Sequence, residues 1–212
     1  LFRSRYCFWI TDESFAIALK NEELHRRIEK CKTMRLNSKK GATRKLAAFP
    51  YKFGEIRYKE SECIIIPAVS SERREYIPIG YLKAGVVVSN SAFAVYDAPL
   101  WLFSILTSKM HMAWVKTIGG RLETRYRYSA QLCYNTFPFP SINDAQREEL
   151  EALAQEVLDI RDQHFDMTLG EMYNPESMPE DLREAHQRLD LAVDSCYRPE
   201  PFASDEERLE CL

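Results

Sequence analysis

Glycine is scarce in this 212-residue sequence, with 7 residues in all. Neither a G-x-G-x-x-G phosphate loop nor a G-x-S-x-G nucleophile elbow occurs, which argues against a nucleotide-handling site or a serine hydrolase. An Asp/Glu-x-Lys triplet is also absent and no lysine follows Lys116, so the usual carboxylate-plus-lysine centre of magnesium nucleases cannot form. The sequence therefore presents no catalytic residues and no cofactor-binding residues of its own.

Metal-binding patterns are missing as well. The six cysteines form no C-x-x-C pair, so reduced thiols are predicted rather than a zinc site or a dense disulfide framework. His111 and His186 have no carboxylate or thiol at ligand spacing, and a structural role is predicted for both. No metal is expected in this chain.

Long apolar runs are missing too. No uninterrupted run reaches the roughly 18 residues of a membrane span, and the first ten residues lack the order of a signal peptide. We therefore expect a cytoplasmic protein with no membrane partner. The chain starts without Met on a strand-like segment, which predicts a piece of a larger polypeptide.

The charges that are present divide sharply along the chain. Residues 1–128 carry 23 Lys and Arg against 12 Asp and Glu, whereas residues 129–212 carry 6 against 20. The net charge of −3 hides these halves of about +11 and −14. This division predicts a basic module that binds a polyanion, followed by an acidic module.

Hydrophobic periodicity predicts an α+β fold. The predicted helices span residues 12–34 with a break near Asn21, 99–116, 143–161 and 179–196, and a short one follows Ser204. Short β-rich runs at 63–69, 85–89 and 92–96 predict a mixed or antiparallel sheet. Residues 35–45 are predicted to form a basic loop.

Two polar segments of the basic module are candidate DNA contacts. Hydroxyls and guanidiniums suit phosphate oxygens and base edges, and these segments supply Ser70, Ser71, Arg73 and Arg74 in one, and Lys39, Lys40, Arg44 and Lys45 in the other. The alternative for the first is a solvated turn in which Glu72 and Glu75 pair with the arginines. A solvated loop is the alternative for the second.

The segment 121–128 gives a sharper signal. Read as one strand, its alternation places Arg121, Glu123, Arg125 and Arg127 on one face and Leu122, Thr124, Tyr126 and Tyr128 on the other. Arginine can bond guanine O6 and N7, and glutamate can accept from cytosine N4, so this face suits a C·G pair in the major groove. The alternative is a ladder neutralised by acidic side chains of a neighbouring strand.

A family resemblance runs through several blocks: Ser70-Ser-Glu-Arg-Arg-Glu-Tyr-Ile-Pro-Ile-Gly80, Ser108-Lys-Met-His-Met-Ala-Trp114, Gly120-Arg-Leu, Tyr126-Arg-Tyr-Ser129, Tyr134-Asn-Thr-Phe-Pro-Phe-Pro140 and Leu169-Gly-Glu-Met-Tyr-Asn-Pro175. The sequence resembles the MmeI-like type IIL restriction-modification enzymes. Such enzymes join a nuclease, an S-adenosylmethionine-dependent adenine-N6 methyltransferase, a target recognition domain and a helical C-terminal part. This chain resembles only the last two.

The resemblance implies a mixed β-sheet DNA target recognition domain with flanking helices in residues 1–140 and an acidic helical domain in 141–212. The partners implied are double-stranded DNA and the methyltransferase domain of the same polypeptide, which would hold the S-adenosylmethionine. Glu123 and Arg125 stand where relatives often carry Lys and Asp, so they are expected to select a C·G pair. Arg127, Arg73 and Arg74 are the further base-contacting candidates, and Arg121 joins the phosphate-binding candidates.

A protein-interaction module without sequence-specific DNA binding is the alternative function, since a basic face can also dock on an acidic partner.

Overall fold

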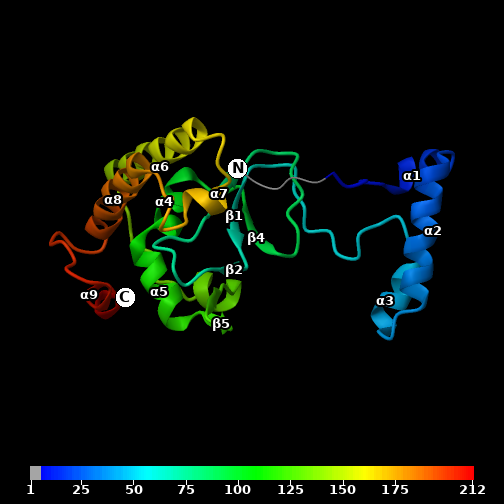
Figure 1. Cartoon of the computed structure of the whole chain (residues 1–212), viewed down its shortest axis with the longest axis horizontal. Helices are drawn as coiled ribbons and strands as arrows, with labels where there is room; N and C mark the ends of the chain where they lie inside the picture. The colour runs from blue at the N-terminus through cyan, green and yellow to red at the C-terminus, as the bar shows by residue number, and fades with distance from the viewer. Residues whose placement is uncertain (1–5) are drawn as a thin grey trace. The chain divides into compact units, whose positions relative to one another are not determined.

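The computed structural model describes residues 6–212, which form two compact units, residues 6–58 and residues 59–212 (Figure 1). The smaller unit contains helices α1 Asp12–Ala18, α2 Glu22–Leu36 and α3 Gly41–Lys45, and a 3-10 turn, η1, at Leu46–Ala48. The predicted break lies at Asn21, whose Oδ1 accepts a hydrogen bond from the amide of Leu24 at 3.1 Å and so begins α2. The predicted basic loop is wrong in part, because residues 41–45 are helical.

The larger unit contains two small antiparallel sheets. In the first, β1 Cys63–Pro67 lies between β3 Gly80–Leu82 and β4 Ala92–Tyr96. In the second, β6 Arg125–Arg127 lies between β2 Val69–Ser70 and β5 Gly120–Leu122. The α+β class is confirmed, and the strand pairing is antiparallel rather than mixed.

The predicted strand at 85–89 is wrong, because these residues form an irregular connection between β3 and β4. Gly85 starts the connection with a φ of 92°, a conformation that a strand does not contain and that glycine adopts without strain. Val86 and Val87 are 42% and 40% exposed, so their apolar side chains are not the core residues that a buried strand requires.

The predicted helix 99–116 is interrupted, and the structure has α4 Leu100–Thr107 and α5 Lys109–Ile118. Ser108 separates them with an extended backbone, φ −79° and ψ 165°. Its Oγ accepts a hydrogen bond from the amide of His111 at 3.3 Å. A serine N-cap therefore restarts the helix inside an otherwise continuous apolar pattern.

A π-helical turn, η2, at Ala130–Tyr134 precedes the C-terminal helices α6 Asp144–Gln163, α7 Leu169–Met172, α8 Glu180–Ser195 and α9 Asp205–Cys211. Three of these helices, α6, α8 and α9, agree with the prediction, whereas η2 and α7 were not predicted. The predicted stripe of α8, namely Leu182, Ala185, Leu189 and Val193, is fully buried. Helices α6 and α8 lie side by side (Figure 1), and each large aliphatic side chain that is buried in this way contributes about 1.5–3 kcal/mol.

The core of the larger unit continues from the sheets into these helices. Ser104 of α4 donates a hydrogen bond to the carbonyl of Leu150 in α6 at 2.6 Å, and Ile64, Phe103 and Val157 belong to one hydrophobic cluster. The acidic helices are thus packed against the same core that supports the strands.

Both histidines that were predicted to be structural are completely buried. The ring of His111 bonds the hydroxyl of Tyr128 through Nε2 at 3.0 Å, and His186 bonds Tyr173. Desolvation lowers the pKa of His111 to about 3 and lowers the pKa of His186 well below its usual value. In residues 6–212 no helix combines the length and apolar composition needed to cross a bilayer.

Candidate nucleic-acid interface

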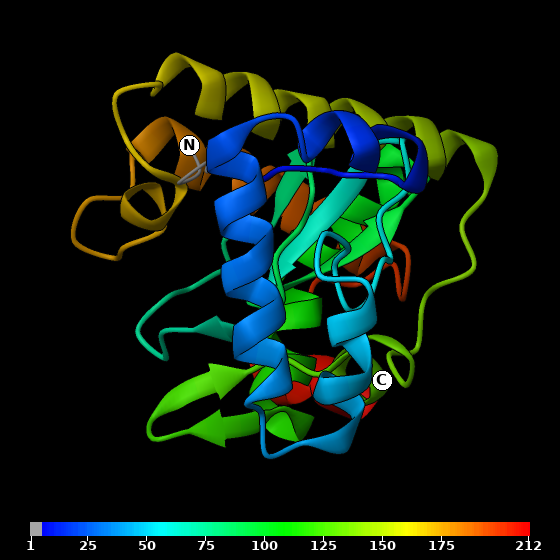
Figure 2. The ribbon, with the colours of Figure 1, turned by 90° about the vertical axis from the view of Figure 1, so that its right-hand side faces the viewer.

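The segment predicted as a single charged strand is a hairpin. Strands β5 and β6 pair antiparallel, with Arg121 opposite Tyr126 and Leu122 opposite Arg125, so Glu123 and Thr124 form a two-residue turn. Glu123 has a φ of 58°, and a positive φ at the first central residue is the pattern of a type II′ turn. Figure 2 shows the hairpin at one end of its unit.

The hairpin separates arginines that one strand would have kept together. Residues that face each other across antiparallel strands share a side of the sheet. Val69, Gly120, Leu122, Arg125 and Arg127 therefore lie on one face, which we call the β6 outer face. Arg121 lies on the opposite face, and its predicted place beside Arg125 and Arg127 is wrong.

The opposite face packs against the core. Tyr126 is 8% exposed and Tyr128 is 4% exposed, which confirms the predicted packing role of both. Leu122 was expected to share this face but is 44% exposed, on the β6 outer face.

Arg121 is committed to local contacts. Its Cζ lies 4.0 Å from the centre of the Tyr126 ring, and Nη2 donates to the carbonyl of Lys116 at 3.2 Å. The carbonyl belongs to the last turn of α5, so the guanidinium both covers an aromatic ring and binds a free helix-terminal acceptor. These contacts attach the hairpin to α5.

Glu123 and Arg125 form an ion pair at the tip of the hairpin. Nη2 of Arg125 donates to Oε2 of Glu123 at 2.7 Å, and the side chains are 46% and 77% exposed. The expected alternative placed the neutralising carboxylates on a neighbouring strand. The carboxylate instead comes from the turn that joins β5 to β6, which leaves both groups open to a ligand.

Arg127 is the freest cation of the hairpin. It is exposed, and within residues 6–212 its guanidinium has no ion pair, side-chain hydrogen bond or ring contact. Its neighbours across the sheet are Val69 and Gly120. Gly120 has no side chain, so β5 places no side chain opposite Arg127 on the β6 outer face.

The segment that follows β2 is turned toward the C-terminal helices. The Oγ of Ser70 is buried and has no hydrogen-bond partner in the described part of the chain. The Oγ of Ser71 accepts from the amide of Arg73 at 3.3 Å. Arg73 pairs with Glu176, and Nη2 of Arg74 donates to the carbonyl of Gly170 at 3.1 Å.

The alternative for this segment was a solvated turn in which Glu72 and Glu75 pair with Arg73 and Arg74, and the structure does not contain it. Glu75 pairs with Arg183 of α8 rather than with an arginine of its own turn. Burial of the Arg74 guanidinium lowers its pKa. No pattern in the local sequence pointed to partners about a hundred residues away.

The basic segment of the smaller unit contains two kinds of cation. Lys39, Lys40 and Lys45 are exposed and have no carboxylate partner among the described residues. Arg44 donates through Nη1 to the carbonyls of Ser38 at 2.9 Å and Lys39 at 3.0 Å. The sequence did not distinguish them, because a guanidinium that caps backbone carbonyls has no short-range signature.

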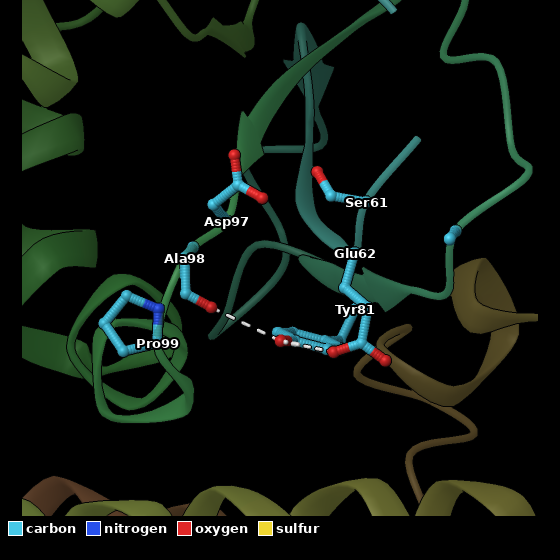
Figure 3. Close-up of a pocket in the computed structure, with 7 residues that line it drawn as sticks. Ser61, Glu62, Tyr81, Asp97, Ala98 and Pro99 are labelled. Atoms are coloured by element: carbon cyan, nitrogen blue, oxygen red, sulfur yellow. Dashed lines mark hydrogen bonds between the residues drawn. The ribbon is translucent and has the colours of Figure 1, made fainter. Parts of the chain in front are cut away.

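A further hollow lies in the larger unit beside β1, β3 and β4 (Figure 3). Its carboxylates are Glu62 and Asp97, and Tyr81 donates to Glu62 Oε2 at 3.2 Å and to the carbonyl of Ala98 at 3.3 Å. An acidic lining repels phosphate. The carboxylates of the hollow therefore do not suit a phosphate, and Lys59 pairs with one of them, Asp97, at 3.3 Å. Residues 6–212 contain no cluster of His, Cys, Asp and Glu suited to a metal ion.

Comparison with known proteins finds relatives over nearly the whole chain. DNA methyltransferase A of Bacillus subtilis (strain 168) is 44% identical over 208 residues, which are 98% of this chain and 24% of that protein. The type IIL restriction-modification enzyme MmeI, whose structure was solved in complex with DNA, is 37% identical with a TM-score of 0.91 over 96% of this chain and 27% of that chain. This chain thus spans about a quarter of each relative.

Two family models divide the sequence between them. Residues 2–141 match the target recognition domain of MmeI, and residues 142–212 match the C-terminal domain of MmeI. The chain therefore belongs to the MmeI family, as its target recognition domain and C-terminal domain.

Proposed function

We propose that this chain recognises a short sequence in double-stranded DNA as the recognition part of a type IIL restriction-modification adenine methyltransferase. The observation that carries the proposal is the β6 outer face. Among the residues that the structure describes, Arg127 has no ion pair and the carboxylate partner of Arg125 is Glu123 of the adjacent turn. The similarity to MmeI, solved in complex with DNA, supports the same function.

The chemistry of this face suits the edge of a C·G pair. A carboxylate accepts a hydrogen bond from cytosine N4, and a guanidinium donates two to guanine O6 and N7. Nη2 of Arg125 and Oε2 of Glu123 lie 2.7 Å apart. On binding, cytosine can replace Arg125 as the partner of Glu123, and the guanine of the same base pair can replace Glu123 as the partner of Arg125. We assign cytosine to Glu123 and guanine to Arg125, with Arg127 as a further contact to a base or a phosphate.

Phosphate contacts would come from exposed cations without carboxylate partners. Lys39, Lys40 and Lys45 fit this role in the smaller unit. The candidates Ser70, Arg121 and Arg44 fit it less well, because the Ser70 hydroxyl is buried and both guanidiniums are bonded to backbone carbonyls. Ser71 stays a candidate, because its Oγ accepts from the amide of Arg73 and its hydroxyl hydrogen can still be donated to a phosphate.

The division of labour within the larger polypeptide is part of the proposal. Residues 1–140 form the recognition domain and residues 141–212 the acidic helical domain, as the two family matches support. Methyl transfer from S-adenosylmethionine to adenine, in the cytoplasm, belongs to the rest of the polypeptide. We assign no residue of this chain to the methyl donor or to catalysis.

The test exchanges the acid and the base of the tip. The double variant E123K/R125D replaces the acceptor for cytosine with a donor and the donor to guanine with an acceptor. The preferred base pair should therefore change from C·G to G·C. Selection of binding sites from a random duplex library, with the wild type and the double variant, measures this preference at two salt concentrations.

A matched control is available in the smaller unit. Glu55 and Arg57 have the same Glu-x-Arg spacing and also form an ion pair, so E55K/R57D makes the same chemical change in residues that do not belong to the hairpin. The proposal requires its base preference to equal that of the wild type. Salt-sensitive binding without any enriched motif in the wild type would favour the protein-interaction alternative.

A further inference from the structure

One buried carboxylate, that of Asp190, bonds both the segment that follows β2 and the helix that precedes β5. Asp190 of α8 is 4% exposed, and its Oδ2 accepts from the hydroxyl of Tyr76 at 2.7 Å. Its Oδ1 accepts from the amide of Lys109 at 2.7 Å. Tyr76 lies in the segment that leaves β2, and Lys109 begins α5, the helix that leads into β5.

The segment after β2 contacts α7, α8 and the loop between them at four consecutive residues. Arg73 pairs with Glu176, Arg74 donates to the carbonyl of Gly170, Glu75 pairs with Arg183, and the Tyr76 ring stacks on His186 with centroids 4.3 Å apart. The Glu75–Arg183 pair is partly sheltered, with side chains 42% and 20% exposed. Sheltered pairs are screened less than open ones.

The other neighbour of β6 is held by the same group of helices. Arg208 of α9 donates to the buried carboxylate of Asp194 in α8, with Nη2 and Oδ2 2.6 Å apart. Asp205 of α9 in turn pairs with Lys116 near the end of α5 at 2.9 Å. The carbonyl of Lys116 accepts from Arg121 of β5 at 3.2 Å.

We propose that the acidic helices α7, α8 and α9 set the position of β6 by holding both of its neighbours, β2 and β5, with Glu75, Arg183 and Asp190 as positioning residues. This inference rests on the proposed function, because it makes the placement of Arg125 and Arg127 a property of the C-terminal helices. It also gives the acidic module a role that its charge allows. A surplus of carboxylates cannot bind phosphate, but it supplies partners for cations of the recognition segment.

The inference assigns Arg73 and Arg74 to this attachment rather than to DNA bases. Strand β6 bonds β2 through two residue pairs, Val69 with Arg127 and Ser70 with Tyr126. A shift of β2 therefore moves the backbone of Arg127 directly. Recognition of base edges depends on hydrogen bonds that weaken steeply with distance and angle, so a small shift of β6 lowers discrimination before it lowers stability.

The experiment uses the full chain with E75R, R183E and the exchanged double variant E75R/R183E. Each single variant places two like charges together, and the double variant restores an ion pair of opposite direction. The first measurement is hydrogen exchange of residues 120–128 without DNA, which we expect to be about fivefold faster in each single variant and to return in the double variant. The second is the affinity ratio of selected to unrelated duplex, expected to fall about fivefold in the single variants and to recover in the double variant.

The pair between Glu156 of α6 and Arg188 of α8 is the matched control. It is also an ion pair that joins α8 to a neighbouring segment, and the side chains of Glu156 and Arg188 are 40% and 47% exposed. The variants E156R, R188E and E156R/R188E should leave the exchange of residues 120–128 at the wild-type rate. They also report any general effect of reversing a charge on α8.

Two results would overturn the inference. One is faster exchange confined to residues 71–76 and α8 while residues 120–128 keep the wild-type rate. The other is a double variant E75R/R183E whose exchange rate and affinity ratio stay at the values of the single variants. That result would mean that the ion pair between Glu75 and Arg183 is not what positions β6. A failure of the proposed function gives a different result, because the wild type itself then shows no base preference. The hydrogen exchange of residues 120–128, measured without DNA, still tests the inference in that case.

Discussion

The guanidinium of Arg121 lies 4.0 Å above the ring of Tyr126, on the opposite face of the β5–β6 hairpin from Arg127. The two arginines are expected to differ in what their removal costs. R121A should lower the free energy of unfolding by about 1 kcal/mol, because it loses a cation–π contact and a helix-terminal hydrogen bond. Thermal unfolding of the free protein measures this loss.

R127A is expected to leave thermal unfolding unchanged, since Arg127 has no side-chain partner within residues 6–212. Its effect should be on DNA instead. If Arg127 binds a phosphate, the slope of log affinity against log salt falls by about 1, and if it binds a base, the preference at one position relaxes. A variant that unfolds earlier but binds DNA as the wild type does would contradict this assignment.

The turn residue Glu123 combines a costly backbone with a useful side chain. Its φ of 58° is unfavourable for residues other than glycine by about 1 kcal/mol. E123G should therefore hold or raise the melting temperature of the protein while it abolishes the preference for cytosine. T124G is the control, because Thr124 does not have a positive φ and glycine there only adds freedom to the unfolded chain. An equal loss of stability in both variants would show that the turn is not strained at Glu123.

The helices could be predicted from the sequence, whereas the hairpin with its turn at Glu123 could not. Helices α6 and α8 have apolar stripes of helical spacing and caps at Asn143 and Pro179, and their bounds agree with the structure within two residues. The hairpin was missed because its turn has Glu rather than Gly at the position of positive φ. Without a turn signal, alternation over 121–128 is equally consistent with one strand, and one strand places Arg121 on the wrong face.

Long-range partners could not be predicted at all. Arg73 and Glu176 are 103 residues apart in the sequence, and each is by itself an ordinary surface charge. The pairing follows from the packing of α8 against the core, which brings residues 170–190 beside residues 73–76. The sequence thus identified which cations belong to the basic module, while the tertiary structure decides which of them are free.

The lysines of the smaller unit offer a separate test of phosphate binding. Replacing Lys39, Lys40 and Lys45 by glutamine should reduce the salt slope of DNA binding by about 0.9 for each lysine that contacts a phosphate. The melting temperature should not change, because the three side chains are exposed and have no carboxylate partner in the described part of the chain. Filter binding over a salt series measures the slope.

The control for this change keeps the number of removed charges constant. K20Q/K30Q/K32Q removes three exposed lysines from other positions of the same unit. An equal decrease of the slope in both triple variants would mean that only net charge matters. R44Q should behave differently from either, since Arg44 bonds two backbone carbonyls, and its loss is expected to appear in stability.

Asp190 predicts a pH dependence of stability that a single substitution removes. Burial raises its pKa from 3.8 to about 6, against the opposing effects of hydrogen bonds from Lys109 and Tyr76. Because the folded state holds this proton more tightly than the unfolded state, the stability it contributes is complete below pH 3.8 and is lost as the pH rises through 6. The loss is on the order of 3 kcal/mol.

D190N keeps the shape of the side chain and cannot ionise. Its carbonyl oxygen can still accept from the amide of Lys109, and its amide can donate to the oxygen of Tyr76. The stability of D190N relative to the wild type should therefore increase between pH 4 and pH 7, as measured by urea unfolding at each pH. D194N is the comparison, since Asp194 is the closer of the two carboxylates that pair with Arg208. Its loss weakens the pairing of a buried guanidinium, which destabilises the fold at neutral pH. A difference between D190N and the wild type that stays constant with pH would show that Asp190 is ionised in the folded protein throughout this range.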